Sequence, residues 1–478
     1  MTDGSAAITG HPWGSGIVSI ARDTQPCHFC HGDTAIRVHG RAAHGGCWEE
    51  AGKPSPSATS APDTPADAPA PNPSTTDAPP QSPARPKAYA YDRNEELDDF
   101  ARALTRVRGN TVEVSREFAA AALEEWHNAL TVEDDPVHFH SNPGRTGIVL
   151  HSWLVKRYGS MEEPEALESQ GVWDISRSRQ MVRIVSWVNP DAAPTTGQHV
   201  TETDVHAQFL AAAHSVQLGD GEPTDILDGN DLAAEDQLAL VKSKCPGYVQ
   251  LASAPNLDGL ASHVRGAFAQ LQAGWWLPMP LAAYLIQTHQ VELDLEAAIL
   301  WRTRPGKSKD IRAHGPRLSR WAKTLVSGRE RLLQRASPET STAPEAAAAA
   351  LSVLKAVYTT FLGGLLRSEE HNDTDTLRPD WCDQVMALSQ ANMLRALDKA
   401  HAAGYDALGG NRDSAWWVDT TAPIQPEGLT FAEQAGKWHV TRHGAVDDDI
   451  IAAHATGSAA KLRKAITAAH RARTEYED

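Results

Sequence analysis

One stretch of this chain cannot form a folded core of its own. From Lys53 to Lys87 the sequence is dominated by Pro, Ala, Ser, Thr and Asp, and it contains no Leu, Ile, Val or aromatic residue. Such a segment buries too little apolar area to offset the loss of chain entropy, so we expect it to stay disordered. It predicts a flexible linker over residues 52–88 between a short head, residues 1–51, and a large globular remainder.

The charge of the whole chain limits how it can contact nucleic acid. The 478 residues carry a net charge of −17, with 41% apolar and 22% charged residues, which is typical of a globular protein with some disordered sequence. Phosphate binding is driven by clustered Lys and Arg. Any contact with nucleic acid must therefore come from a local basic patch.

Neither a membrane partner nor a secretory leader is expected. The N-terminal residues lack a basic region followed by an apolar one. Residues Ala346–Leu366 are apolar enough to resemble a span, but Lys355 lies at the centre, where a charge costs about 2.5–3.5 kcal/mol. We expect a buried helix there. Three of the five cysteines fall in the first fifty residues, which favours a metal site in a reducing compartment, so we expect a cytoplasmic protein.

Two pairs of metal-binding residue types lie in the head. Cys27-x-x-Cys30 is followed, thirteen residues later, by His44-x-x-Cys47. Two ligands separated by two residues fit one tight turn, and two such turns complete a tetrahedron around Zn²⁺. A module this small has no core, so the metal would supply most of its folding energy. We predict a structural zinc site formed by Cys27, Cys30, His44 and Cys47; the residues that could replace His44 are His28, His31 and His39.

Apolar spacing in the globular remainder predicts a mixture of helices and strands. Thr201–Val205 is expected to be a strand that runs into a helix over Gln208–Val216, and Tyr405–Val418 to be a hairpin. Gly147–Trp153 has the composition of a strand or loop, and Arg177–Val188 has apolar residues at helical spacing. Further helices are predicted over Glu95–Val107, Arg116–Leu130, Arg378–Ala402 and Lys461–Arg473.

Three segments carry the residue types that nucleotidyl transfer requires. Asp204 ends a predicted strand, Lys355 lies in the alanine-rich helix, and Asp413 follows a Gly-Gly-Asn-Arg sequence that suits a tight turn. Nucleotidyl transfer uses two carboxylates that hold a pair of Mg²⁺ ions about 3.5–4 Å apart, and a cation for the triphosphate. We expect Asp204 and Asp413 to hold the two Mg²⁺ ions, Lys355 to bind phosphate and Phe209 to exclude a 2′-hydroxyl beneath the sugar.

The order of these segments resembles motifs A, B and C of family B DNA polymerases, above all the protein-primed ones. Asp204 and Phe209 match the aspartate and the aromatic gate of motif A, Asp-x-x-Ser-Leu-Tyr-Pro. Lys355 and Gly363 match the first and last positions of motif B, Lys-x-x-x-Asn-Ser-x-Tyr-Gly. The resemblance extends over about 201–418, in short motifs.

The match to motif C, Asp-Thr-Asp-Ser, is carried by Asp413-Ser414. Together the motifs imply an α+β fold with a palm-like antiparallel sheet and helices, and a substrate pocket that includes Thr359, Gly363 and Ser414. They imply DNA as a partner, with a priming or terminal protein as a second one. Arg378-Pro-Asp-Trp381 also resembles replication- or telomere-associated proteins of actinobacterial linear replicons and plasmids, which implies a mobile element.

The chain also departs from these motifs. Asn411 stands where motif C has its first aspartate, Thr359-Thr360 replace Asn-Ser, and Leu362 replaces the motif B tyrosine. Three alternatives follow. The first is an active two-metal polymerase, and the second is a non-catalytic DNA- or replisome-binding protein with a degenerate polymerase fold. The third is a zinc-containing DNA-binding regulator with an unrelated helical domain.

Each expected site residue also has a simpler structural interpretation. Asp204 before a helix is a common N-cap, and Asp413 fits ordinary turn chemistry. Lys355 could be a surface lysine and Phe209 a core residue. Proximity of the two carboxylates across a sheet separates the polymerase interpretations from the others.

A basic stretch lies between the first two motifs. From Arg302 to Arg335 there are eleven Lys or Arg residues and two acids, which suits a phosphate-facing surface, although a solvated helix face gives the same pattern. Trp301 and Trp321 could stack on bases there, although packing in the core is the commoner fate of tryptophan. The predicted nucleic-acid contacts are Arg302, Arg304, Lys307, Lys309, Arg312, Arg317, Arg320 and Lys323.

These observations divide the large domain into three parts. We predict an N-terminal α/β subdomain over residues 89–200, a palm- and fingers-like domain over 201–425, and a C-terminal helical extension over 426–478.

Overall fold

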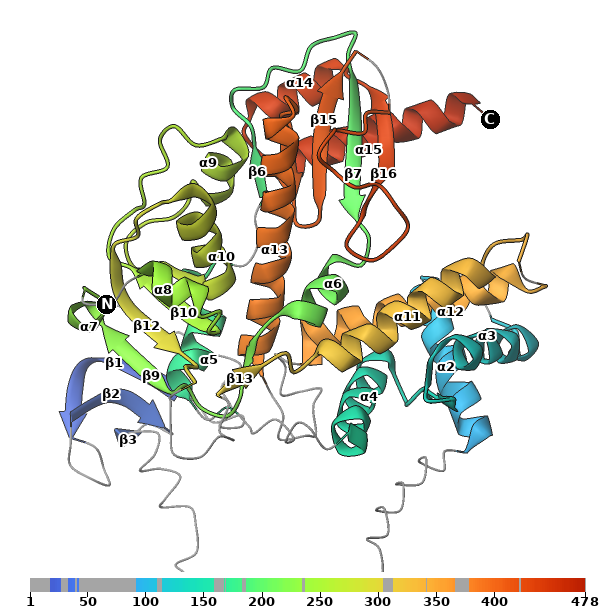
Figure 1. The fold of residues 1–478 in the computed structure, drawn as a ribbon, viewed down its shortest axis with the longest axis horizontal. Coiled ribbons are helices and arrows are strands. Elements are labelled where there is room, and N and C mark those ends of the chain that lie inside the picture. The colour runs from blue at the N-terminus through green and yellow to red at the C-terminus, as the bar shows by residue number, and fades with distance from the viewer. Residues whose placement is uncertain are drawn as a thin grey trace, which may run out of the picture. The chain divides into compact units, whose positions relative to one another are not determined.

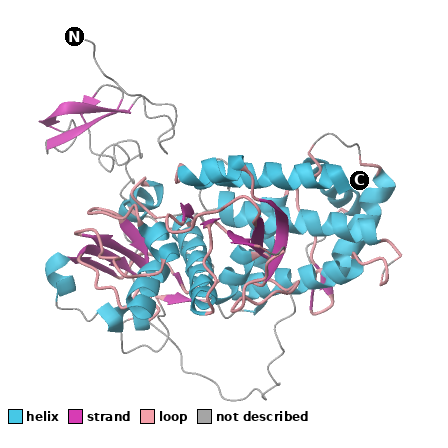
Figure 2. Cartoon of the chain, turned by 90° about the horizontal axis from the view of Figure 1, so that it is seen from above, coloured by secondary structure: helices cyan, strands magenta, loops and turns pink. Residues whose placement is uncertain are grey.

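The computed structural model describes residues 18–26, 33–38, 41–42, 92–109, 114–158, 167, 169–182, 186–233, 237–303, 313–340, 342–365, 378–420 and 423–477. The chain separates into two compact units, Met1–Ala84 and Arg85–Asp478. Figure 2 shows that helices and strands are mixed throughout the second unit. Its sheets are antiparallel, which confirms the predicted α+β class.

The first unit contains an antiparallel three-stranded sheet. Its strands are β1 (Val18–Pro26), β2 (Asp33–Val38) and β3 (Arg41–Ala42), in the order β1-β2-β3. The four predicted zinc ligands, Cys27, Cys30, His44 and Cys47, lie outside the described residues, as does the linker over 52–88. The zinc site therefore stays a prediction.

A five-stranded antiparallel sheet is the main β-structure of the second unit (Figure 1). Its order is β16-β7-β15-β14-β6, so β7 lies at its interior between β16 and β15. The predicted boundaries at 200/201 and 425/426 cross this sheet, and 426–478 is not purely helical because it supplies β16. The strands are β6 (Ser186–Val188), β7 (His199–Val205), β14 (Gly409–Asn411), β15 (Ser414–Asp419) and β16 (Trp438–Ala445).

The two faces of this sheet contact different helices. Val205 and Trp417 belong to a core cluster that includes residues of α13 (Pro379–Ala402). Val200 and Trp416 pack with residues of α14 (Asp448–Ala455) and α15 (Ala459–Glu477). Because side chains alternate along a strand, Glu202 and Asp204 lie on the same face as Val200.

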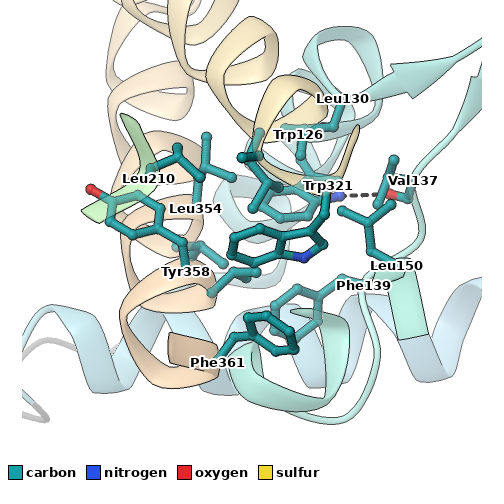
Figure 3. Packing of buried hydrophobic residues seen from close by; sticks show 14 of the residues in the cluster. Trp126, Leu130, Val137, Phe139, Leu150, Leu210, Trp321, Leu354, Tyr358 and Phe361 are labelled. Atoms are coloured by element: carbon teal, nitrogen blue, oxygen red, sulfur yellow. Dashed lines mark hydrogen bonds between the residues drawn. The ribbon is translucent and has the colours of Figure 1, made fainter. Parts of the chain in front are cut away.

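A group of helices forms the largest apolar core (Figures 1 and 3). Trp126, Phe139 and Trp321 are fully buried at its centre. The helices are α2 (Arg93–Val107), α3 (Arg116–Ala129), α4 (Pro143–Tyr158), α6 (Gln208–Ser215), α11 (Ser319–Arg335) and α12 (Pro344–Thr360).

Helix α12 is a core helix with one exposed edge. Its alanines pack against α3, α4 and α11, whereas Lys355 is exposed. Within the described residues, 344–363 is the one stretch long and apolar enough to cross a membrane, and 56% of its apolar window is buried inside the protein. This burial agrees with the predicted buried helix.

A second antiparallel sheet has the order β11-β10-β12-β9, and its core is shared with α13. Its strands are β9 (Asp225–Asp228), β10 (Gly247–Leu251), β11 (Trp276–Pro278) and β12 (Leu295–Leu300). The helices around it are α7 (Gly229–Ala233), α8 (Gln237–Lys242), α9 (Ser262–Phe268), α10 (Met279–Ala283) and the π-helical turn η1 (Tyr284–Thr288). The remaining elements are β4 (Thr131–Val132), β5 (Asp135–Pro136), α5 (Gln170–Arg177), β8 (Leu218–Gly219), β13 (His314–Gly315) and η2 (Phe361–Leu365).

Two local predictions were wrong. Gly147–Trp153 is not a strand but part of α4, which Pro143 begins while the Asn142 side chain accepts a 2.9 Å hydrogen bond from the Arg145 N–H. This Asn-Pro start is an ordinary helix signal. Arg177–Val188 is not a helix either, because α5 ends at Arg177 and β6 begins at Ser186.

Candidate active site

Asp204 lies near the end of the interior strand β7. It is in register with Ser414 of β15 on one side and with His439 of β16 on the other. The N–H of Val205 donates a 2.7 Å hydrogen bond to its carboxylate. Asp204 is therefore held within the sheet and does not cap α6, whose N-cap residue is Ala207.

Asp413 lies in the two-residue turn between β14 and β15. Arg412 has φ 60°, the left-handed conformation that such a turn requires. The carbonyl of Asp413 accepts a 3.0 Å hydrogen bond from the N–H of Val205. The main chain beside Asp204 is thus bonded directly to Asp413, which brings residues more than two hundred positions apart to the same end of the sheet.

The two carboxylates affect each other's charge. Burial and the neighbouring charge of Asp413 raise the pKa of Asp204 from 3.8 to about 7. Burial also raises the pKa of Asp413, while nearby Arg463 and Lys355 oppose the shift. Two partly buried acids of like charge favour either a shared proton or a cation.

Helix α12 brings two side chains to this pair. Lys355 is exposed and close enough to Asp204 and Asp413 for its charge to lower the pKa of both. Tyr358, one turn further on, is buried, and its pKa is raised to about 12 by burial and by the charges of both aspartates, although Arg329 opposes this shift. The lysine and the two aspartates of the predicted constellation are therefore brought together, and the tyrosine joins them.

A third carboxylate lies on the same face of β7. Glu202 is 2% exposed and forms ion pairs with Arg442 of β16 and, at 4.0 Å, with Arg463 of α15. Its charge contributes to the raised pKa of Asp204. Sequence reasoning missed Glu202, although its position two residues before Asp204 on one strand was a usable signal.

Two histidines beside Asp204 were also missed. The rings of His206 and His439 stack 3.6 Å apart with an interplanar angle of 3°. Burial and the proximity of His439 lower the pKa of His206 to about 4, and burial lowers that of His439. Both rings are therefore neutral at pH 7. His439 could not be found from sequence alone because its position depends on the register of β16.

The remaining expected substrate residues differ in their contacts. Phe209 is half-buried and packs against the helical core. The Thr359 hydroxyl donates to the Lys355 carbonyl at 2.7 Å, and the buried Ser414 hydroxyl donates to the Asn411 carbonyl at 3.0 Å. Gly363 is exposed in η2, and an added Cβ there would meet no atom within 4 Å.

Asn411, which replaces an aspartate of motif C, faces a different strand. Its side-chain oxygen accepts a 2.7 Å hydrogen bond from the Ser186 hydroxyl on β6. The β14–β15 turn consequently presents one carboxylate, Asp413, toward β7.

The basic stretch is only partly exposed. Arg317 pairs with Asp220, and Arg302 lies 3.9 Å from Asp225. Arg320 lies over the Tyr158 ring, 4.1 Å from its centroid, and Lys323 is exposed on α11. Four predicted contacts lie outside the described residues: Arg304, Lys307, Lys309 and Arg312.

Of the two alternatives for the tryptophans Trp301 and Trp321, the structure shows packing. Trp301 is 0% exposed and Trp321 is 1% exposed. Their indole N–H groups donate to the carbonyls of Gly221 and Gly147, each at 3.1 Å. Both are core residues.

No family model matches the sequence, and no curated protein matches it either. Solved structures of Phi29 DNA polymerase do align with it. The complex with primer-template DNA and incoming nucleotides aligns with a TM-score of 0.42 and 13% identity over 68% of this chain and 55% of that one. The complex with single-stranded DNA gives a TM-score of 0.41 and 12% identity over the same shares. The chain thus spans about half the length of the polymerase chains that it matches.

Proposed function

We propose that this protein is a nucleotidyl transferase of the DNA polymerase type, with its active site at the end of β7. The observation that carries the proposal is the coupling of Asp204 and Asp413, where the charge of Asp413 helps to raise the pKa of Asp204 to about 7. Perturbed carboxylates that share one site are typical of catalytic centres. Their order along the chain with Lys355, which resembles that of family B polymerases, supports the same reaction.

The donor set suits hard divalent cations. The carboxylate oxygens of Asp204 and Asp413 are the ligand type that Mg²⁺ and Mn²⁺ prefer. A cation would relieve the burial cost of both charges and the repulsion from Asp413 that helps to raise the pKa of Asp204. Bound there, a pair of Mg²⁺ ions would activate the primer hydroxyl and neutralise the leaving pyrophosphate. Glu202 is already neutralised by Arg442 and Arg463, so its role is to orient β7 and α15.

Protein side chains supply the other contacts. Lys355 is exposed beside the carboxylates, where its ammonium group binds the triphosphate of the incoming nucleotide. The stacked, neutral rings of His206 and His439 offer a flat surface next to Asp204 for a base or sugar. In this proposal Phe209, Thr359, Gly363 and Ser414 border the nucleotide, and DNA is the partner.

The resemblance of the motifs supports two further parts of the proposal. The protein acts in the replication of a mobile element such as a plasmid, in the cytoplasm, and it extends a nucleic-acid or protein primer. A terminal protein would be the partner in the second case.

One observation favours a second function, DNA binding without catalysis. The turn that carries Asp413 has Asn411 bonded to Ser186 in place of a second carboxylate. A site with fewer negative charges holds metal more weakly. The zinc head and the basic stretch would then bind DNA or a replisome protein.

Primer extension separates the two functions. We expect the full-length protein to add deoxynucleotides to a primed template with Mg²⁺ or Mn²⁺, and Asp413→Asn to lower the rate by about 10²–10³-fold or more, the size of effect seen when one electrostatic contact to a transition state is removed. Asp419→Asn, at the far end of β15, is the matched control and should retain activity. Wild-type protein that binds DNA but extends no primer would support the second function instead.

A further inference from the structure

Three potential metal ligands lie close to one another in space, at sequence positions well before Asp204 and Asp413. Glu96 belongs to α2, His127 to α3, and His138 to the segment that follows β5. Their side-chain ligand atoms all lie within 4.8 Å of one another. Among the described residues, no other group of three His, Cys, Asp or Glu side chains meets that criterion.

Both histidines hydrogen-bond to the carboxylate, at distances slightly shorter than those between ligands of one ion. His127 Nε2 is 2.8 Å from Glu96 Oε1, and His138 Nδ1 is 3.0 Å from Glu96 Oε2. Nitrogen and oxygen ligands at about 2.0–2.2 Å from a zinc ion are separated by about 3.0–3.4 Å from each other. A shift of a few tenths of an ångström in the side chains would therefore admit an ion between them.

The main chain around the ligands is held firmly by the core. Trp126 and Phe139, the neighbours of His127 and His138, are fully buried and pack edge to face with ring centroids 5.9 Å apart. The Trp126 indole N–H donates to the Val137 carbonyl at 2.7 Å, as Figure 3 shows. The two histidines are thus fixed relative to one another by residues that cannot move without opening the core.

The carboxylate is also prepared for a cation. Glu96 is 1% exposed, and its Oε1 accepts a 2.7 Å hydrogen bond from the Phe139 N–H, which orients it in the manner of an outer-shell contact. The His127 and His138 side chains are 22% and 28% exposed, which leaves a path from solvent.

We propose that Glu96, His127 and His138 bind a divalent transition-metal ion of the Zn²⁺ class and so tie together α2, α3 and the segment before α4. Two imidazoles and one carboxylate form a known ligand set for zinc, and such a site keeps a position for water. The site is independent of the cysteines in the head and of the carboxylates on β7. Neither the zinc head nor the transferase reaction is needed for it.

Zinc content of matched full-length variants tests the proposal. Protein equilibrated with Zn²⁺ and freed of excess should hold one more zinc per chain than His127→Gln/His138→Gln, measured by mass spectrometry of the metal. A single variant, His138→Gln, should weaken zinc binding by at least about 10–100-fold, the loss seen when even an outer-shell partner is removed. His401→Gln is the control, since His401 is exposed and hydrogen-bonds at 2.6 Å to Asp406, a carboxylate outside the proposed site. It should bind zinc as the wild type does.

Thermal unfolding gives a second readout of zinc binding, because an ion that binds only the folded state raises the melting temperature. Zinc should raise the Tm of the wild type more than that of the double variant. If the double variant does not fold, zinc X-ray absorption on full-length Cys27→Ser/Cys30→Ser/Cys47→Ser should show imidazole ligands. Equal zinc content in wild type and a folded double variant, or zinc bound without imidazole in the cysteine variant, would overturn the proposal.

Discussion

At the scale of single residues, the environment of Asp204 disfavours the ionised form of its carboxylate. Burial and Asp413 raise its pKa from 3.8 to about 7. A carboxyl with a raised pKa in the folded state binds its proton more tightly there than in the unfolded chain. Its contribution to stability is therefore fully present below about pH 4 and is lost as the pH rises through about 7. Such a cost is typical of a residue kept for function.

Asp204→Asn should consequently stabilise the metal-free protein above pH 7. The gain at pH 8 is expected to be about 1–3 kcal/mol, allowing for partial solvent access, and it should shrink toward zero near pH 4. Urea unfolding with EDTA over a series of pH values measures it. Destabilisation by Asp204→Asn at pH 8 would show that the charge of Asp204 is compensated within the protein.

The residues around Asp204 also show how far sequence can locate a site. Asp204, Lys355 and Asp413 could be found because each lies in a short motif with a recognisable chemical role. Glu202 did offer a usable signal, two residues before Asp204 on one strand, but His206, Tyr358 and His439 could not be found, because their proximity depends on strand register and on the rotation of α12. For Trp301 and Trp321 both stacking and packing stayed open, because a basic neighbourhood says nothing about the burial of an aromatic ring.

At the scale of elements, several helices were predictable from their apolar spacing, whereas α4 was not. The predicted helices over Glu95–Val107 and Arg378–Ala402 agree with α2 and α13 to within two residues. Asp447 caps α14 by accepting a 2.9 Å hydrogen bond from the Ile450 N–H. Gly147–Trp153 was misassigned because its β-branched residues have strand propensity, whereas packing of Gly147 against Phe361 fixes it as a helix.

The hairpin that carries Asp413 depends on glycine for a reason the sequence did not reveal. Gly409 and Gly410 lie in β14 and not in the turn. A Cβ on Gly409 would lie 2.7 Å from the Trp187 carbonyl, and one on Gly410 would lie 2.9 Å from the Trp187 indole nitrogen. The glycines therefore allow β14 to approach β6.

Gly409→Ala should destabilise the protein by about 1–3 kcal/mol, the usual cost of overpacking, and should lower transferase activity by shifting Asp413. Gly171→Ala, on α5 and outside the proposed site, is the matched control, since its added Cβ would meet no atom closer than 3.9 Å. Chemical unfolding and primer extension on both variants measure the two effects. Equal stability of the two variants would mean that β14 can move away from Trp187 freely.

At the scale of the whole molecule, the site exists because distant segments share one sheet. β6 precedes β7 in the chain, whereas β14, β15 and β16 follow α13, near residue 400 and beyond. Composition gave no sign of this arrangement, because pairing between distant strands leaves no local pattern. That is why sequence boundaries at 200/201 and 425/426 fall within the sheet.

A buried ion pair lies at the start of α13 and is hydrogen-bonded to β8. Arg378 and Asp380 are 0% and 1% exposed, and Arg378 donates to both oxygens of Asp380 at 2.9 and 2.7 Å. Arg378 and Trp381 also donate to the carbonyl of Gly219 on β8, at 2.9 and 2.8 Å. The Arg-Pro-Asp-Trp sequence is thus a structural element at the start of α13.

Asp380→Asn should cost about 3–5 kcal/mol in the free energy of unfolding, because it removes the carboxylate whose two oxygens both pair with the buried Arg378 charge. Arg378→Met/Asp380→Leu removes both charges and should cost less than the single change. Urea unfolding of the two variants provides the comparison. A single variant as stable as wild type would show that solvent reaches Arg378.

The central claim is that Asp204 and Asp413 share divalent cations, and calorimetric titration with Mn²⁺ tests it most directly. Full-length wild type and Asp204→Asn/Asp413→Asn differ only at these two carboxylates, so any other cation site contributes equally to both. We predict that the wild type binds Mn²⁺ with additional sites that the double variant lacks. Identical titrations of the two proteins would contradict the claim.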